Sequence, residues 1–274
     1  MNTSLPTSRT LTVEGRTLSW REAGSGEPVL LLHSGGFSSR QWRKLADTLA
    51  ASHRVLTPDL LGYGASSPWP VGEPFHPRQE IAALERLLDD VGAPVHLVGH
   101  SYGGYLALQL ALARPGNVRS LALFDPVAFG ALTPADRAEL GMDTLAPYDA
   151  SRGVDEVWLA RFIELWNGPG AWKSLHPTTQ EEFRRVGWKV SEEVAGLLAD
   201  TTSLATYARV SVPTLLLGGR LTPLFEQRVL ERLGGALPRV RLELLPDMGH
   251  MGPITHAPLV NAAIVAHVHG AGAL

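Results

Sequence analysis

One serine stands in a setting that could make it a nucleophile. Residues 99–103 read Gly-His-Ser-Tyr-Gly, between an apolar run over 94–98 and a helix-like stretch over 102–114. A serine in a sharp strand-to-helix turn has its hydroxyl pushed outward, and flanking glycines leave room for that turn. The start of the helix also directs free N–H groups toward the same place. A bare junction of this kind would equally fit a helix N-cap, but the glycines favour Ser101 as the nucleophile of an acyl transfer.

A serine hydroxyl needs a general base, and the chain has ten histidines. His250 lies in the glycine-containing loop 247–253, after the last apolar run. Ligands of a parallel sheet bind beyond the carboxyl ends of its strands, where this loop must lie. We therefore predict that His250 is the base. His33 could orient the loop that follows it, and His256 opens a helix. The remaining candidates occupy ordinary positions at strand ends, on the surface or in the terminal helix: His53, His96, His176, His267 and His269.

The third member of such a triad is a carboxylate that orients the imidazole and stabilises the imidazolium. It commonly follows a later strand, but residues 217–223 contain no carboxylate and Glu226 is the next one. Asp125 ends the strand beside the serine, and the chain order Ser, Asp, His is kept. We predict Asp125 as the acid, although an aspartate before proline can also simply cap a turn. Asp247 is too near His250 in sequence to orient it easily.

Acyl transfer also needs N–H donors for the developing oxyanion. One donor should be the backbone N–H of Tyr102, directly after the serine. The other should come from the loop 33–37, His-Ser-Gly-Gly-Phe, whose paired glycines let backbone approach a ligand closely. We favour the N–H of Gly35, with that of Ser34 as the alternative. A second glycine-bearing loop, 59–66, is expected to support this one, with no chemistry of its own.

The segments that would position these residues alternate between short apolar runs and amphipathic stretches. Solid apolar runs are typical of strands buried on both faces, and their alternation with helices favours a parallel sheet. A hairpin over 10–13 and 17–21 opens the chain. The predicted strands are 28–32, 53–58, 94–98, 118–124, 212–217 and 240–245, and the predicted helices are 41–50, 78–91, 102–114, 223–233 and 258–269.

This alternation stops between residues 129 and 207, which are typical of helices and turns. A structureless loop of that length is improbable in a compact domain. We therefore predict an α/β core domain, 1–128 and 208–274, with a helical cap, 129–207, inserted after the sixth strand. The aromatic content of the cap indicates an apolar, partly closed pocket, with Trp158 and Trp166 as candidates for its lining. Four of the seven tryptophans lie in this segment: Trp158, Trp166, Trp172 and Trp188.

Together these segments resemble the α/β-hydrolase superfamily over nearly the whole chain. The order is that of the superfamily: Leu-Leu-Leu-His-Ser-Gly-Gly (30–36), Pro-Asp-Leu-Leu-Gly-Tyr-Gly-x-Ser (58–66), Gly-His-Ser-Tyr-Gly-Gly (99–104) and Gly-His (249–250). The resemblance implies a mostly parallel, eight-stranded sheet flanked by helices. Glycine is usual where Ser34 stands, a small departure if only its backbone is used. An acid after the sixth strand is similar to the layout of haloalkane dehalogenases, whose nucleophile is aspartate. Ser101 therefore argues against dehalogenase and epoxide-hydrolase chemistry.

Composition excludes several other classes of protein. The net charge of −3 and the lack of a basic run argue against nucleic acid as a partner. The absence of cysteine excludes a catalytic thiol, a disulfide framework and thiolate zinc sites. No stretch approaches the roughly 18 apolar residues of a membrane span, and no secretory signal opens the chain. We expect a cytoplasmic protein with a small-molecule partner, no membrane, no metal and no cofactor. The oligomeric state stays open.

The predicted function is that of a serine hydrolase acting on a small or medium ester, thioester or lactone through an acyl-enzyme. The same triad could hydrolyse a C–C bond in a diketone-type substrate, or act as a cofactor-free perhydrolase or haloperoxidase. A receptor that uses the pocket only for binding would keep the same fold. Labelling by a fluorophosphonate, lost in Ser101→Ala, separates the enzymes from the receptor.

Overall fold

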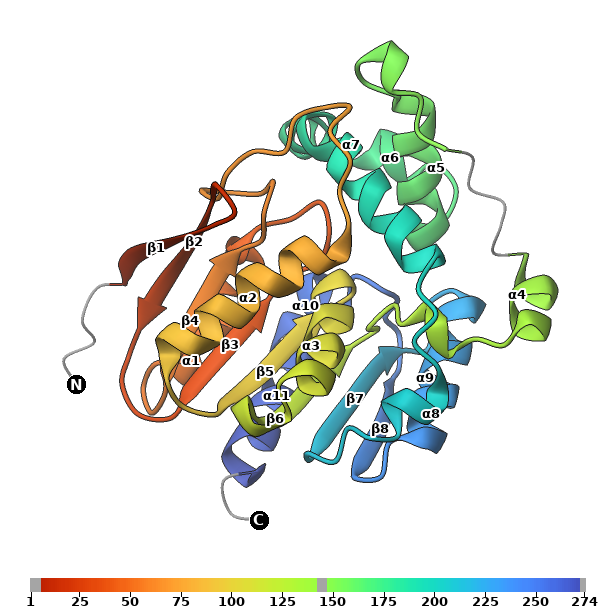
Figure 1. The fold of residues 1–274 in the computed structure, drawn as a ribbon. Helices are drawn as coiled ribbons and strands as arrows, with labels where there is room; N and C mark the ends of the chain where they lie inside the picture. Colours follow the sequence, from red (N-terminus) through yellow and green to blue (C-terminus); the bar gives the residue numbers. More distant parts are fainter. Residues whose placement is uncertain (1–5, 142–146, 272–274) are drawn as a thin grey trace.

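Eight strands form one sheet in the computed structural model, which describes residues 6–141 and 147–271. The strand order is β1-β2-β4-β3-β5-β6-β7-β8 (Figure 1). The first two strands pair antiparallel, as do β2 and β4, and all other neighbours are parallel. The strands are β1 (Thr7–Val13), β2 (Arg16–Ala23), β3 (Pro28–Leu32), β4 (Arg54–Asp59), β5 (Val95–His100), β6 (Val118–Phe124), β7 (Thr214–Gly219) and β8 (Val240–Leu245).

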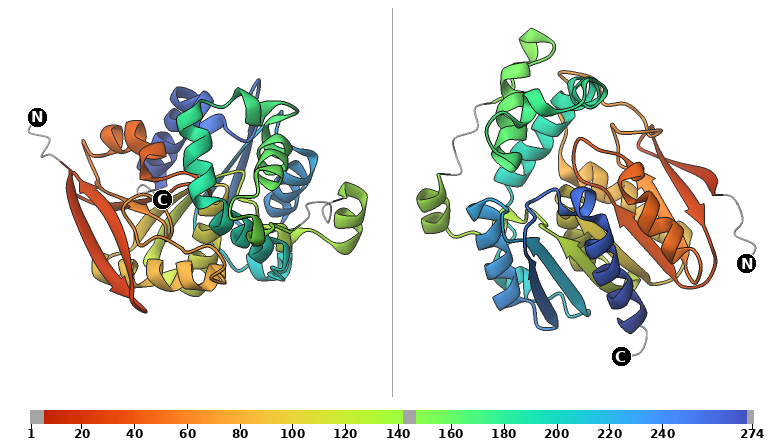
Figure 2. Two further views of the ribbon diagram at one scale, coloured as in Figure 1. Left: turned by 90° about the horizontal axis from the view of Figure 1, so that it is seen from above. Right: turned by 180° about the vertical axis from the view of Figure 1, so that it is seen from behind.

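Helices cover both faces of this sheet. On β3, alternate aliphatic side chains enter two separate hydrophobic clusters, one on each face. Three helices, α2, α3 and α9, contribute to the first cluster, and α1 and α11 to the second (Figures 1 and 2). The predicted α/β-hydrolase architecture, a mostly parallel eight-stranded sheet flanked by helices, is thus confirmed. These helices are α1 (Arg43–Leu49), α2 (Pro77–Val91), α3 (Tyr102–Ala113), α9 (Leu224–Ala236) and α11 (Ala257–Ala271).

Residues 129–207 lie between β6 and β7, and we call them the inserted segment. Its longest helices, α5 and α7, lie together with α6 beyond the carboxyl ends of the parallel strands (Figure 1). The last helix of the segment, α8, returns the chain to the side of α9. The helices of the segment are α4 (Pro134–Leu140), α5 (Glu156–Asn167), α6 (Ala171–Ser174), α7 (Pro177–Leu198) and α8 (Leu204–Tyr207).

Two local features differ from the expectation. The helix predicted over 41–50 begins as a 3₁₀ turn, Ser39–Trp42, and becomes α-helical only at Arg43. Strand β8 is exposed at half of its side chains, because it lies at the edge of the sheet and not within it. Among the described residues, no helix combines the length and apolar character that crossing a bilayer requires.

Candidate active site

Ser101 stands at the junction between β5 and α3, in a backbone conformation that few non-glycine residues adopt. Its φ and ψ are 54° and −121°, which lie outside the ordinary helix and strand regions. The flanking glycines are needed because a Cβ on Gly99 would lie 2.4 Å from the Gly103 carbonyl oxygen, and one on Gly103 would lie 2.4 Å from that of Leu32. The side chain of Ser101 makes no capping hydrogen bond with the helix. It is partly exposed and free to face the pocket.

Three side chains from distant parts of the chain meet in one line of hydrogen bonds. The Oγ atom of Ser101 lies 3.0 Å from His250 Nε2, and His250 Nδ1 lies 3.1 Å from Asp125 Oδ2. A proton on Nδ1 donates to the carboxylate, which leaves Nε2 to accept the hydroxyl hydrogen of the serine. The structure therefore brings together all three residues predicted as the triad. This arrangement can move a proton from the serine to the imidazole.

Burial opposes charge on both partners of the His250–Asp125 pair. Their side chains are 4% and 0% exposed. Burial lowers the pKa of His250 to about 3 and raises the pKa of Asp125 well above its usual range. The Thr222 hydroxyl, which donates to Asp125 Oδ2 at 2.5 Å, acts in the opposite direction and favours the carboxylate. The imidazole is consequently neutral, which is the form that a general base requires.

A strained turn carries Asp125 out of β6 toward the imidazole. Both Asp125 and Val127 have positive φ, 44° and 38°, a conformation that is particularly unfavourable for a β-branched residue. Two bonds hold the turn in place: Asp125 N–H donates to the Leu217 carbonyl, and Val127 N–H donates to Glu226 Oε1. Backbone strain of this kind persists where surrounding contacts determine the conformation. The turn directs the carboxylate at His250.

Glu226, the rival carboxylate, supports this turn and makes no bond to the histidine. It is fully buried in α9, and its hydrogen bond goes to the Val127 N–H at 3.2 Å. Burial and the nearby Asp125 raise the pKa of Glu226 well above its usual range. Position 222, in the loop where the acid would more often be found, instead provides the hydroxyl that donates to Asp125. The sequence shows that residues 217–223 contain no carboxylate. It did not indicate that Thr222, in this segment, would donate to Asp125.

The loop predicted to form the oxyanion hole is fixed by a glutamine that the sequence did not single out. Gln41 Oε1 accepts from both the N–H and the hydroxyl of Ser34, and its Nε2 lies 3.0 Å from His100 Nδ1. His100 Nε2 in turn donates to the His250 carbonyl at 2.8 Å. Because the Ser34 N–H is already bonded, this contact favours the predicted donor, the N–H of Gly35, over the alternative. Gln41 thus links the loop 33–37, through His100, to the loop of His250.

His33 joins the same loop to the 59–66 loop. Its Nδ1 donates to the Ser34 carbonyl at 2.8 Å, and its Nε2 accepts from the Leu60 N–H at 3.0 Å. Burial lowers the pKa of His33 to about 4, so the ring is neutral and can act as donor and acceptor together. The carboxylate of Asp59 accepts from the N–H groups of Ser39 and Ala65, both at 2.8 Å. Through these contacts, His33 and Asp59 hold the 33–37 loop and the 59–66 loop against each other.

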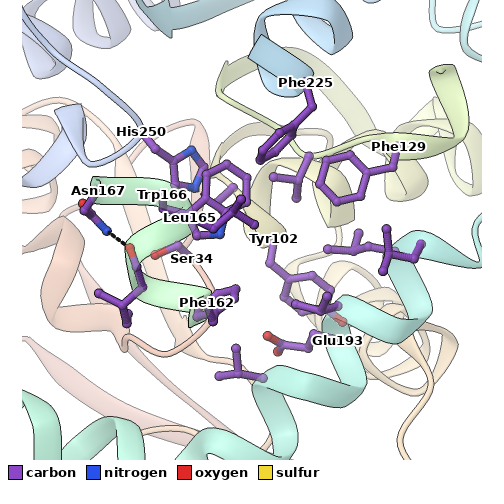
Figure 3. A pocket seen from close by; sticks show the side chains of 18 of the residues that line it. Ser34, Tyr102, Phe129, Phe162, Leu165, Trp166, Asn167, Glu193, Phe225 and His250 are labelled. Atoms are coloured by element: carbon purple, nitrogen blue, oxygen red, sulfur yellow. Dashed lines mark hydrogen bonds between the residues drawn. The ribbon is translucent and has the colours of Figure 1, made fainter. Parts of the chain in front are cut away.

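A mostly apolar pocket of about 140 Å³ opens at Ser101 and His250. A cavity of roughly 150 Å³ accommodates a ligand the size of benzene, so the pocket fits a small acyl group. Ser34, Gly35 and Tyr102, which carry the predicted oxyanion donors and their alternative, also line it. Figure 3 shows His250 at one side of this space and Glu193 across it. Its aromatic walls are Phe37, Phe129, Phe162, Trp166, Phe183 and Phe225.

Of the two tryptophans considered for the lining, the structure places one directly against His250. The Trp166 ring stacks on the His250 imidazole, with centroids 3.8 Å apart and planes 22° apart. Trp158 is buried and packs between Tyr148 and Phe162, with centroid distances of 5.6 and 5.1 Å. The inserted segment therefore supplies part of the surroundings of His250.

A buried ionic cluster fixes the inserted segment beside the pocket. Lys189 of α7 is 1% exposed, and its Nζ lies 2.9 Å from Glu80 Oε2 and 2.5 Å from Glu193 Oε1. Glu80 belongs to α2, so this contact joins the segment to the helices on the sheet. Tyr63 donates to Glu193 Oε2 at 2.9 Å. Burial raises the pKa of Glu193 to about 7, although the Lys189 charge opposes this. No periodic pattern in the sequence indicated this cluster.

One group of potential metal ligands lies at the other end of the strands. Ligand atoms of Glu27, His53 and His96 all lie within 4.8 Å of one another. Other partners already engage them: Arg119 lies 3.3 Å from a Glu27 oxygen, and Ser120 Oγ lies 2.8 Å from His96 Nδ1. Glu27 and His53 directly precede β3 and β4, and His96 is the second residue of β5. The group therefore lies at the opposite end of the strands from Ser101.

Comparison with known proteins extends over most of the chain. Residues 29–263 match the model of the alpha/beta hydrolase family. A fluoroacetate dehalogenase of Burkholderia sp is 37% identical over 255 residues, which cover 83% of this chain and 82% of that protein. A pimeloyl-[acyl-carrier protein] methyl ester esterase of Vibrio atlanticus is 28% identical over 257 residues, 91% of this chain and 97% of the relative. One curated relative is matched over only 111 residues, and the chain spans 29% of its length.

Solved structures agree with this assignment. The crystal structure of epoxide hydrolase A from Mycobacterium thermoresistibile superposes with a TM-score of 0.77 at 25% identity, covering 97% of this chain and 99% of that one. The sheet order, the turn at Ser101 and the extent of the family match lead to one conclusion. The chain belongs to the alpha/beta hydrolase family and is a hydrolase.

Proposed function

We propose that this hydrolase cleaves small carboxylic esters, or related thioesters and lactones, through an acyl-enzyme on Ser101. The observation that carries the proposal is the continuous line of contacts from Ser101 Oγ through His250 to Asp125. The apolar pocket of about 140 Å³ favours a substrate whose acyl group is small and carries few polar substituents. A further part of the proposal is that residues 129–207 act as a cap domain on a core of residues 1–128 and 208–274.

The mechanism has two steps. Ser101 Oγ attacks the substrate carbonyl while His250 Nε2 takes the hydroxyl proton, and the Gly35 and Tyr102 N–H groups bind the oxyanion. Asp125 stabilises the resulting imidazolium. The imidazolium then gives its proton to the departing alcohol, which leaves the acyl group on Ser101. In the second step His250 deprotonates a water, which attacks the acyl-enzyme, and the carboxylic acid leaves as Ser101 regains a proton.

The nature of the nucleophile distinguishes this proposal from dehalogenase chemistry. Attack of a serine oxygen on a carbon–halogen bond would release halide and leave an alkyl ether on Ser101. An ether has no carbonyl carbon that water could attack, so the enzyme would stop after one turnover. An aspartate nucleophile forms an ester in the same step, and water can hydrolyse that ester. A serine at position 101 therefore supports acyl transfer.

Labelling with a fluorophosphonate tests the proposal directly. We expect stoichiometric labelling of the wild type, measured as a mass increase on the intact protein, and none in Ser101→Ala. A series of p-nitrophenyl esters should show higher kcat/KM for acetyl and butyryl than for dodecanoyl groups, because the pocket has a volume of only about 140 Å³. A wild type that neither labels nor hydrolyses these esters, while remaining folded, would favour a pocket that only binds a ligand. Lactones and diketones, with acid release followed by titration at constant pH, test the other hydrolytic chemistries.

A further inference from the structure

The imidazole of His250 is held between two rings that come from different parts of the fold. Trp166, in the last turn of α5, stacks on it with centroids 3.8 Å apart and planes 22° apart. The ring of His100, at the end of β5, has its centroid 5.0 Å away and its plane tilted by 47°. His100 also bonds the His250 carbonyl. The base thus has one support from the sheet and one from the inserted segment, and Figure 3 shows Trp166 beside it.

The indole of Trp166 is itself braced. The edge of Phe225, at the start of α9, packs on it with centroids 5.1 Å apart and planes at 72°. Phe129 packs in turn on Phe225, with centroids 5.9 Å apart. Pairs of this type contribute on the order of 1 kcal/mol beyond their buried area. A braced indole can therefore resist rotation of the imidazole that it covers.

The stacked indole restrains the imidazole of His250 in a direction that its hydrogen bonds do not. Apart from the stacking, the imidazole is held through two hydrogen bonds, to Asp125 and Ser101, at its two ring nitrogens. Two bonds of that kind allow the ring plane to turn about the line that joins them, whereas a stacked ring opposes this turning. The covering indole also contributes to the burial of the base, which is only 4% exposed.

We propose that Trp166 is a positioning residue for His250, which fixes the plane of the imidazole and excludes water from its bond to Ser101. This inference rests on the proposed function, in which His250 is the general base. It makes the position of α5 part of the catalytic arrangement: when α5 moves away from the sheet, the base loses one of its two supports. A misplaced catalytic group can cost about 100-fold in rate.

Kinetics of Trp166→Leu and Trp166→Phe test the positioning. We expect kcat for p-nitrophenyl acetate to fall about tenfold in Trp166→Leu, and to stay within about threefold of the wild type in Trp166→Phe, which keeps an aromatic face. The acid limb of the kcat/KM profile should move to higher pH in Trp166→Leu, because a less buried imidazole has a pKa nearer its usual value. Trp172→Phe, in α6 of the same segment, is the matched control and should leave both unchanged.

A role in substrate lining alone would give a different result. In that case Trp166→Leu would raise KM while kcat and the acid limb stayed as in the wild type, and the proposal would be overturned. Circular dichroism and thermal melting establish that each variant is folded.

A spectroscopic measurement tests the stacking without any reference to catalysis. The ring current of the indole should shift the imidazole proton signals of His250 upfield, and these signals are assigned from their loss in His250→Gln. The shift should shrink in Trp166→Phe and vanish in Trp166→Leu. An unshifted His250 signal in the wild type would contradict the inference, even if fluorophosphonate labelling supported the proposed function. A shifted signal in a protein that does not label would instead contradict only the proposed function.

Discussion

Contacts from neighbouring side chains, and not its place in the chain alone, hold the carboxyl group of Asp125 in its position. Thr222 donates to the oxygen that faces His250, and Glu226 holds the next turn of backbone through Val127. Removing any one of these groups changes a different property of the site. The roles of Asp125, its hydroxyl partner Thr222 and the buried Glu226 can therefore be separated by substitution.

Asp125→Asn should lower kcat by up to about 10⁴-fold with little change in KM, because the amide neither holds the required imidazole tautomer nor stabilises the imidazolium. Steady-state hydrolysis of p-nitrophenyl acetate measures this. Asp247→Asn is the matched control: this aspartate is exposed, has a φ of 56° that asparagine also tolerates, and lies three positions before His250. Equal activity of the two variants would show that Asp125 is not the acid.

Glu226→Gln should keep kcat within about threefold of the wild type. Burial and the nearby Asp125 raise the pKa of Glu226 well above its usual range, so the charged form is disfavoured there and an uncharged glutamine of the same size should be tolerated. The amide oxygen can still accept from the Val127 N–H. A loss of kcat as large as that of Asp125→Asn, in a folded protein, would instead identify Glu226 as the acid.

At the scale of elements, helix α7 connects the inserted segment to the helices on the sheet through Lys189. This lysine bridges Glu80 of α2 and Glu193 of its own helix, with almost no exposed surface. A second basic residue of α7, Arg184, pairs with Glu156 and Glu181 at the surface. Lys189 and Arg184 therefore form the same type of ion pair with glutamate, the first in the protein interior and the second at the surface.

Lys189→Met should lower the free energy of unfolding by about 3–5 kcal/mol, because it leaves carboxyl groups buried without their cation. Arg184→Met, the matched surface control, should lower it by at most about 1 kcal/mol. Urea unfolding followed by tryptophan fluorescence measures both. Restoring stability by the further changes Glu80→Gln and Glu193→Gln would show that the uncompensated charge is the cause. Equal effects of the two single substitutions would contradict this account of the cluster.

At the scale of the whole molecule, several buried histidines make stability depend on pH. Burial lowers the pKa of His33 and of His96 to about 4, that of His250 to about 3, and that of His100 well below its usual value. In the unfolded chain these groups titrate near 6.5. The unfolded state therefore binds more protons between pH 6.5 and 4. The stability that the neutral rings contribute is complete above pH 6.5 and is lost as the pH falls through this range.

The free energy of unfolding should accordingly decrease between pH 6.5 and 4, by at most about 1.4 kcal/mol per pH unit for each fully buried histidine. The raised pKa of Glu193, about 7, opposes part of this decrease. Urea unfolding at a series of pH values measures the slope. His96→Gln should make it shallower, whereas His176→Gln, an exposed helix cap, should not. A slope unchanged by His96→Gln would show that its burial has no such effect.

The sequence alone determined the fold, because the periodicity of strands and helices, the positions of the glycines and the order of the motifs can all be read along the chain. Short apolar runs predicted a mostly parallel sheet, and the structure has one. The carboxyl ends of parallel strands share one edge, which is why Ser101, Asp125 and the loop of His250 could be expected to meet there. The prediction of Asp125 as the acid rested on the absence of a carboxylate after the strand that is β7 in the structure.

Only the tertiary structure decided which side chains touch across elements. Gln41 bonds both Ser34 and His100, Lys189 reaches Glu80, and Trp166 covers His250. Apart from Ser34, which lies seven positions before Gln41, the partners lie far apart in the chain, on elements that no local pattern orients relative to one another. Packing of the inserted segment on the sheet selects these contacts. The surroundings of the proposed base are therefore a property of the folded molecule, whereas its place in the chain order is a property of the sequence.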